Sequence, residues 1–101
     1  LRPMLYGARS EAQIADRFGG GTACHLVGKH CESGDILIRD ADLNQPAAGD
    51  LVVVPATGAY GHAMANNYNG ALRPPVIFAS NGDARVVVRR ESDDDLLVRD
   101  V

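Results

Sequence analysis

Residues 76–88, VIFASNGDARVVV, place two apolar segments on either side of an Asn81-Gly82 pair. Both segments are rich in β-branched residues, which favour extended strands. Asn and Gly readily adopt the positive φ values that a two-residue hairpin turn needs. The stretch therefore predicts an antiparallel β-hairpin, and we expect the rest of the fold to be built from similar strands.

Three shorter apolar segments upstream have the same character. They are Leu26-Val27, Ile36-Leu37-Ile38 and Leu51-Val52-Val53-Val54, the last of which follows a turn over 46–50 that contains Pro and Gly. Each segment has the length and composition of a strand. We therefore expect a mainly β fold with one or two short helices.

Three segments depart from the β pattern. Residues 58–69 are rich in helix-favouring Ala and Met, so they predict a short helix. In residues 10–18, Ser10 and Gln13 imitate a helix capping box, whereas the apolar positions suit one face of a strand, and we favour the strand. The acidic run at 93–95 resembles the first turn of a short helix, but its simplest interpretation is a solvated end of the chain.

The size of the chain limits what it can bury. With 101 residues, 46% hydrophobic and 23% charged, it corresponds to one globular domain spanning 1–101. The segments 51–54 and 86–88 are apolar at every position, so both faces of these strands need cover. Because so small a domain cannot supply all of that cover, we expect it to dock onto another domain or subunit.

The charge balance excludes some partners. Ten basic and 13 acidic residues give a net charge of -3, with no basic stripe, which argues against nucleic acid and anionic membranes. No apolar run approaches the roughly 18 residues of a membrane span, and the first residues lack the pattern of a secretory signal. We therefore expect a cytoplasmic protein.

The cysteines and histidines suggest neither a disulfide nor a metal. On one continuous strand, Cys24 and Cys31 would lie about 23 Å apart on opposite faces, far beyond disulfide reach, so we expect free thiols. The candidate metal ligands are Cys24, His25, His30, Cys31 and His62, and they show no CxxC or HxxxH spacing. We expect no metal site.

Residues 28–35, GKHCESGD, concentrate a thiol, an imidazole, an amine and two carboxylates between two glycines. A neighbouring carboxylate favours the protonated thiol, so Cys31 beside Glu32 suits a proton donor better than a nucleophile. The neighbouring Lys29 and His30 would instead favour the thiolate form of Cys31. The alternative is a polar strand end that carries an incidental buried cysteine.

Four blocks together resemble a known family. They are RPMLYGA (2–8), GKHCESGDILIRD (28–40), PATGAYGHAMANNYN (55–69) and RPPVIFASNGDARVVVRRES (73–92). In this order they are similar to the C-terminal domain of the diaminopimelate decarboxylases, pyridoxal-phosphate enzymes built like alanine racemase. The resemblance implies an antiparallel β-barrel or sandwich of the alanine racemase C-terminal type. It also implies the conversion of meso-2,6-diaminopimelate to L-lysine and CO2, a step of lysine biosynthesis.

The resemblance also implies roles for five residues. Cys31 matches the acid that protonates the carbanion left after decarboxylation, in the active site of the partner subunit. Glu32 matches the carboxylate that binds the distal ammonium of the substrate, and Arg2 and Tyr6 match the pair that binds its distal carboxylate. Tyr60 matches the tyrosine that contacts both cofactor and substrate. Arg2 and Tyr6 as surface residues, and Tyr60 as a helix anchor, are the simpler alternatives.

The implied cofactor is pyridoxal 5'-phosphate, whose Schiff-base lysine lies in an N-terminal TIM-type barrel outside this chain. Lys29 is the only lysine here and does not match that residue, so the fragment alone is expected to be inactive. The implied partners are the barrel, a second subunit of a homodimer and the small-molecule substrate. Tyr68 is left as a packing residue.

Two other functions remain open. A related decarboxylase acting on ornithine or arginine would keep Cys31 and Tyr60, whereas Glu32 with Arg2 and Tyr6 favours a substrate that carries both charges at its far end. A small β-barrel binding module without catalysis would instead fold tightly on its own, and the all-apolar strands argue against it.

Overall fold

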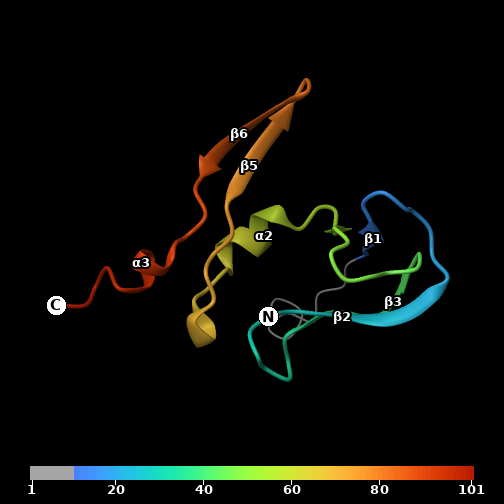
Figure 1. The fold of residues 1–101 in the computed structure, drawn as a ribbon, viewed down its shortest axis with the longest axis horizontal. Coiled ribbons are helices and arrows are strands. Elements are labelled where there is room, and N and C mark those ends of the chain that lie inside the picture. Colours follow the sequence, from blue (N-terminus) through green and yellow to red (C-terminus); the bar gives the residue numbers. More distant parts are fainter. Residues whose placement is uncertain (1–10) are drawn as a thin grey trace.

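Three two-stranded antiparallel sheets are the main regular structure of residues 11–101, the part of the chain that the computed structural model describes (Figure 1). The strands are β1 (Gln13–Ile14), β2 (Thr22–Val27), β3 (Ile36–Leu43), β4 (Val52–Val53), β5 (Val76–Ser80) and β6 (Asp83–Val88). The helices are α2 (Gly58–Ala63), the 3-10 helix η1 (Tyr68–Gly70) and α3 (Asp93–Leu96). The prediction of a mainly β fold with short helices is confirmed, and the sheets of residues 11–101 do not close into a barrel.

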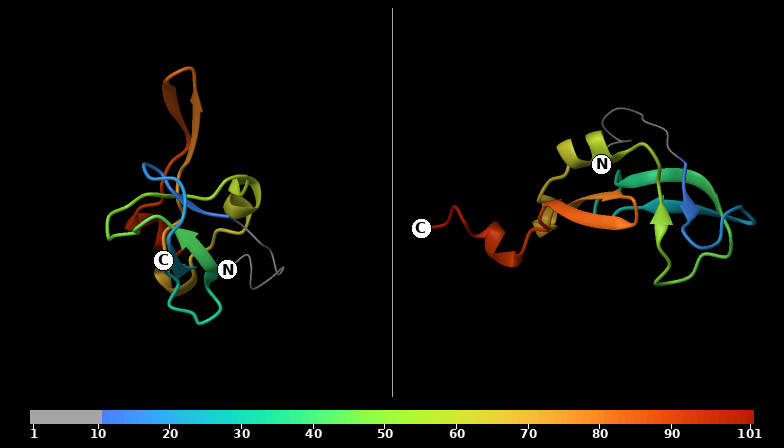
Figure 2. Two further views of the ribbon diagram at one scale, coloured as in Figure 1. Left: turned by 90° about the vertical axis from the view of Figure 1, so that its right-hand side faces the viewer. Right: turned by 90° about the horizontal axis from the view of Figure 1, so that it is seen from above.

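The β5–β6 hairpin forms as its turn residues predict. Ser80 pairs with Asp83, and Asn81 and Gly82 between them have φ values of 51° and 81°. Both values lie in the left-handed region that Asn and Gly tolerate best. Figures 1 and 2 show the hairpin projecting away from β1, β2 and β3.

The other two sheets form the opposite part of the molecule. Strands β2 and β3 pair from Thr22–Leu43 to Val27–Ile36, with register shifts along the way. Strand β1 pairs with β4, which brings residues 13–14 beside 52–53. The strand favoured for 10–18 is therefore present but only two residues long, and Ser10 lies outside the described residues.

The buried apolar core of the described residues is small. It consists of Ile14, Ala41 and Leu43, and Ala12, Cys24 and Ile38 are partly buried against it. All six belong to the sheets β1–β4 or lie next to them. The hairpin and the helices therefore contribute nothing to this core.

Much apolar surface is left open by this arrangement. The chain exposes 7741 Å², whereas a compact protein of this mass exposes about 5,500 Å². Its radius of gyration is 15.3 Å, compared with about 13 Å for a compact domain of 100 residues. Val86, 60% exposed, and the neighbouring 87–88 are open to solvent, as are 51–53. Residues 11–101 do not supply the cover that their apolar strands were predicted to need.

The extent of each short helix is set by its local backbone conformation and hydrogen bonds. Helix α2 occupies only the first part of the predicted 58–69, because the backbone leaves the helical region after Met64. Helix α3 forms over the acidic run, and Ser92 and Asp95 make a capping box at its start. Arg89 donates two hydrogen bonds to Asp95, at 2.6 and 2.8 Å, and these bonds hold the pKa of Asp95 well below its usual range. No helix in the described part is long and apolar enough to cross a membrane.

The hairpin turn provides a test of the fold. Gly82→Ala should lower the free energy of unfolding of the chain by about 1 kcal/mol, because alanine is strained at a φ of 81°. Gly61→Ala, inside α2 with nothing within 4 Å of the added methyl, should raise it by about 0.5–1 kcal/mol. Urea titrations of both variants would measure the two changes. Equal effects would contradict the assigned turn.

Candidate functional site

The dense segment 28–35 forms the loop that joins β2 to β3. Its ends are closed by a hydrogen bond from the Gly28 amide to the Asp35 carbonyl at 2.8 Å, and the Asp35 amide bonds to the Glu32 carbonyl at 3.0 Å. A side chain at position 28 would collide with the carboxylate of Asp35. A larger residue at position 28 would therefore have to displace the Asp35 carboxylate, and the loop is a compact unit.

Asp35 is the buried charge of this loop, with 3% of its surface exposed. Its Oδ2 accepts the amide N–H of His30 at 3.0 Å. Burial alone would raise the pKa of Asp35, but the hydrogen bonds to its carboxylate outweigh burial and hold that pKa below its usual value. The carboxylate thus stays charged and keeps the loop closed around it.

Cys31 lies exposed at the far side of the loop, with a φ of 54°. A residue other than glycine seldom adopts this left-handed conformation, and the exposed side chain faces outward from the loop. The alternative of an incidental buried cysteine is therefore wrong. Cys24 and Cys31 are both free thiols, as predicted, although they do not share a strand, because β2 ends at Val27.

The next residue, Glu32, has a partly buried and oriented carboxylate. Its Oε1 accepts the Gly34 amide at 3.0 Å and the Ser33 hydroxyl at 3.2 Å. Within residues 11–101 no hydrogen bond of the structure engages Oε2. One oxygen is thus fixed by the loop, and the other is suited to a cationic group of a ligand.

A second segment holds this loop from outside. The side-chain amide of Asn69 donates to the His30 carbonyl at 2.7 Å, and Nδ1 of His30 lies 3.3 Å from the Tyr68 carbonyl. The His30 and Tyr68 rings also meet edge to face, 6.2 Å apart. The Tyr68 side chain thus packs on the His30 ring, as predicted, and Asn69 is a contact that the sequence did not reveal.

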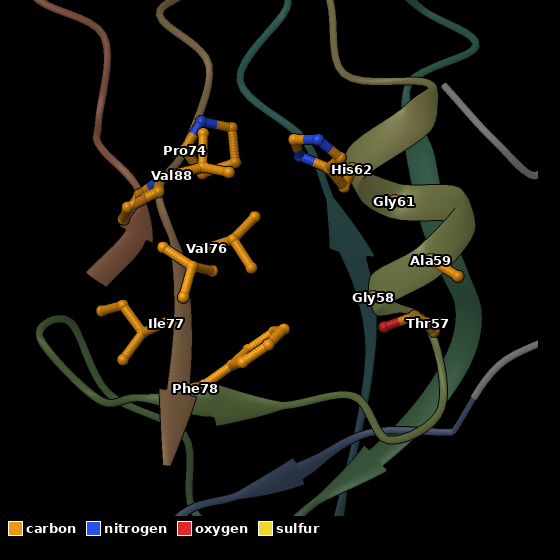
Figure 3. Close-up of a pocket in the computed structure, with 12 residues that line it drawn as sticks. Thr57, Gly58, Ala59, Gly61, His62, Pro74, Val76, Ile77, Phe78 and Val88 are labelled. Atoms are coloured by element: carbon orange, nitrogen blue, oxygen red, sulfur yellow. The ribbon is translucent and has the colours of Figure 1, made fainter. Parts of the chain in front are cut away.

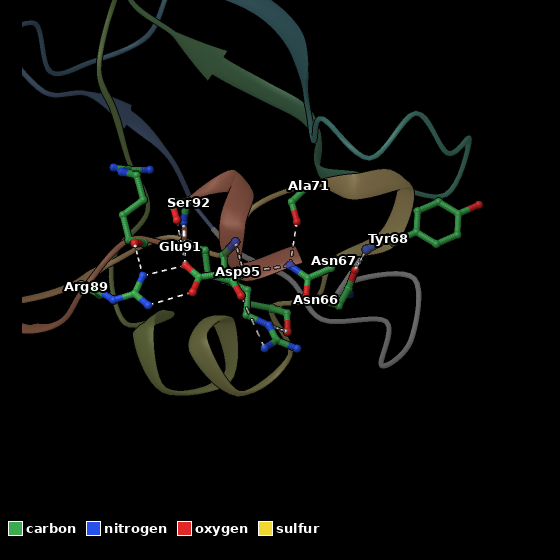
Figure 4. A network of polar contacts seen from close by, with 11 residues as sticks. Asn66, Asn67, Tyr68, Ala71, Arg89, Glu91, Ser92 and Asp95 are labelled. Carbon is green, nitrogen blue, oxygen red and sulfur yellow. Dashed lines mark hydrogen bonds and ion pairs between the residues drawn. The ribbon is translucent and has the colours of Figure 1, made fainter. Parts of the chain in front are cut away.

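The same segment is anchored on its other side by a polar network (Figure 4). The Asn67 side chain donates to Glu91 at 2.8 Å and to the Ala71 carbonyl at 2.9 Å, and the Arg73 amide donates to Glu91 at 2.6 Å. The bonds from Asn67 and the Arg73 amide lower the pKa of Glu91. Segments before and after the hairpin are thereby tied together.

The remaining predicted site residues lie elsewhere or cannot be described. Tyr60 is on α2 and 57% exposed, and Lys29 is exposed in the loop beside His30. Arg2 and Tyr6 fall outside the described residues. In the part of the chain that the structure covers, no three His, Cys, Asp or Glu side chains are grouped to hold a metal ion.

An apolar groove of about 810 Å³ separates α2 from the base of the β5–β6 hairpin (Figure 3). The α2 side carries Thr57, Ala59 and His62. The hairpin side is formed mainly by apolar residues, among them Pro74, Val76, Ile77, Phe78 and Val88. Among the described residues that line the groove there is no Asp, Glu, Lys or Arg, so it is suited to apolar side chains.

Comparison with known proteins gives a consistent result. Residues 1–58 match the family model described as the pyridoxal-dependent decarboxylase C-terminal sheet domain. The chain is 50% identical over 101 residues to the diaminopimelate decarboxylase of Actinosynnema pretiosum subsp. auranticum and 48% identical over 103 residues to that of Bacillus subtilis. These matches cover 99% and 100% of this chain but 23% and 24% of the relatives.

Solved structures show the same relationship. The diaminopimelate decarboxylase of M. jannaschii, in a co-complex with L-lysine, superposes with a TM-score of 0.90 at 32% sequence identity. The match covers 99% of this chain and 23% of that one. The chain thus spans about a quarter of the length of its relatives.

The close approach inside the loop can be tested with one methyl group. Gly28→Ala should displace the Asp35 carboxylate and release the His30 amide, whose hydrogen exchange should become roughly tenfold faster. Ser33→Ala, in the same loop, removes only the hydroxyl bond to Glu32 and should leave the His30 amide unchanged. Exchange measured by mass spectrometry on peptides from 28–35 would show the difference. The same rate in both variants would show that the His30 amide is not held by the Asp35 carboxylate.

Proposed function

Since this chain belongs to the family of pyridoxal-dependent decarboxylases and matches their C-terminal sheet domain, we propose that it is the C-terminal part of a diaminopimelate decarboxylase. The complete enzyme would convert meso-2,6-diaminopimelate to L-lysine and CO2. The observation that carries the proposal is the 28–35 loop, which presents a thiol and an oriented carboxylate side by side on a closed backbone. The names of the relatives support the choice of substrate.

Cys31 is proposed as the acid of the reaction. Pyridoxal phosphate, when bound, supplies the electron sink that makes loss of CO2 from the substrate feasible. Once CO2 has left, the Cα atom needs a proton, which the Cys31 thiol would donate through Sγ. Its exposed position and outward conformation support this role, since a donor must reach an atom that belongs to another part of the site.

Glu32 is proposed to select the substrate. Its Oε2 would accept the distal ammonium while Oε1 stays fixed by Gly34 and Ser33. Arg2 and Tyr6 would bind the distal carboxylate, a pairing for which a guanidinium group is well suited. A substrate such as ornithine has no such carboxylate, so the proposed pair favours diaminopimelate over the related basic amino acids.

The cofactor would meet this chain at Tyr60. The Tyr60 phenol, more than half exposed on α2, could donate a hydrogen bond to a phosphate oxygen of pyridoxal phosphate. The Schiff-base lysine is proposed to lie in the barrel. Lys29, in the loop beside His30, is not assigned that role.

The partners are proposed from the open apolar surface. An N-terminal barrel domain and the second subunit of a homodimer would cover strands β4 to β6 and the groove beside α2. The surface in excess of a compact domain, about 2,200 Å², is within the range of a permanent interface. Closure of the sheets into a barrel or sandwich would belong to that assembly. The two free thiols favour a reducing compartment, and the cytoplasm is proposed as the location.

Substrate selection is tested by Glu32→Gln in the complete enzyme. The variant leaves the distal ammonium without a charged partner, so kcat/KM for meso-diaminopimelate should fall by at least about a hundredfold. Glu11→Gln makes the same chemical change at an exposed carboxylate and should have no effect. Steady-state kinetics with diaminopimelate and with ornithine would measure both. Unchanged kinetics for Glu32→Gln would remove this residue from the site.

The shared active site is tested by subunit exchange. Full-length Cys31→Ala and a variant of the barrel lysine should each be inactive, because each lacks one essential group. In a hybrid dimer, one site keeps the lysine of the first variant and receives Cys31 from the second. Statistical exchange gives half hybrids with half their sites intact, hence about a quarter of wild-type activity.

Native mass spectrometry would verify that hybrids have formed. Activity that stays at the level of the separate variants would then mean that Cys31 acts within its own subunit or takes no part. The test measures the assignment of Cys31 independently of the role of Glu32.

A further inference from the structure

His30, the residue before Cys31, is held at three polar groups. Its amide donates to Asp35 Oδ2 at 3.0 Å, and its carbonyl accepts from Asn69 Nδ2 at 2.7 Å. Its ring Nδ1 lies 3.3 Å from the Tyr68 carbonyl, and because a carbonyl only accepts, this bond requires the proton on Nδ1. Only the first of these bonds comes from within the 28–35 loop.

The bond to the His30 carbonyl has a particular geometric effect. That carbonyl lies in the same planar peptide group as the nitrogen of Cys31. Fixing the carbonyl therefore fixes the plane from which the φ of Cys31 is set, and with it the direction in which the thiol leaves the backbone. Because a φ of 54° is unfavourable for cysteine, the surrounding bonds must hold it.

Asn69 is itself placed rigidly enough to do this. Its φ of 53° lies in the left-handed region, which asparagine tolerates better than most residues. Asn66 Oδ1 accepts the Tyr68 amide at 3.0 Å. Asn67, two residues before Asn69, is bonded to Glu91, as Figure 4 shows. The side-chain amide of Asn69 is thus carried by a turn whose backbone is anchored.

We propose that Asn69 is a positioning residue for Cys31, which acts by holding the His30–Cys31 peptide plane. This inference rests on the proposed role of Cys31 as proton donor. Asn69 does not contact the thiol and takes no part in the proton transfer. Its loss should misdirect the thiol, so that proton delivery to the substrate becomes slow while substrate binding is retained.

The decisive variant is Asn69→Asp in the complete enzyme. Aspartate has nearly the same shape and also tolerates positive φ, but it lacks the N–H donor. Asn69→Gly is the second variant, because it removes the amide without adding charge and keeps the backbone conformation accessible. Asn44→Asp is the matched control, since Asn44 makes a similar bond to the Phe18 carbonyl, 3.3 Å long and remote from the loop.

Two measurements test the proposal. In the enzyme without substrate, hydrogen exchange of peptides from 28–35 should become roughly tenfold faster in both Asn69 variants and stay unchanged in the control. With meso-diaminopimelate, kcat should fall roughly tenfold while KM stays within about twofold, and the solvent deuterium isotope effect on kcat should rise. A mere loss of folded enzyme would lower kcat without raising the isotope effect.

Several outcomes would overturn the proposal. They are an unchanged isotope effect, or a change in KM without a fall in kcat. Wild-type behaviour of Asn69→Gly would also overturn it, because the effect of Asn69→Asp would then come from charge repulsion. If the wild-type enzyme does not turn over diaminopimelate at all, the proposed function fails. The exchange measurement needs no turnover, so it still decides whether Asn69 holds the loop.

Discussion

The hydrogen bond from the His30 amide to the buried carboxylate of Asp35 is the interaction on which the candidate site depends. A buried charge is costly unless donors surround it, so the backbone of the loop folds around this carboxylate. That fold leaves no room for a side chain at Gly28 and forces the chain through a left-handed residue at Cys31. The outward thiol and the oriented Glu32 beside it follow from the same closed loop.

The rest of the chain is divided between a small core and a large open surface. Ile14, Ala41 and Leu43 stabilise the sheets that carry the loop, whereas the hairpin and α2 present their apolar side chains outward. Such an exposed apolar surface is favourable only in a larger assembly, where docking buries it. The loop is supported by the chain's own bonds, and the groove beside α2 is left for another part of the enzyme.

Local features of this fold could be predicted from the sequence, and the contacts between distant segments could not. Asn81-Gly82 and its flanking β-branched residues identify a hairpin, because turn and strand preferences act over a few residues. Cys31 and Glu32 are consecutive in the sequence, so their proximity could be predicted. Asn69, 39 residues from His30, has no local signature that marks it as a partner of His30. The barrel or sandwich that the resemblance implies is not formed by the described residues, whose strands pair only two by two.

The contacts that hold the Cys31 loop and those that hold helix α3 respond differently to ionic strength. The Cys31 loop is held to its neighbour by two hydrogen bonds to backbone carbonyls, one from the Asn69 amide and one from the His30 ring. Helix α3 is instead fastened by the exposed ion pair of Arg89 and Asp95. Dissolved salt weakens exposed ion pairs but hardly affects hydrogen bonds between uncharged groups. The geometry around the thiol should therefore be insensitive to changes in salt that loosen the C-terminal helix.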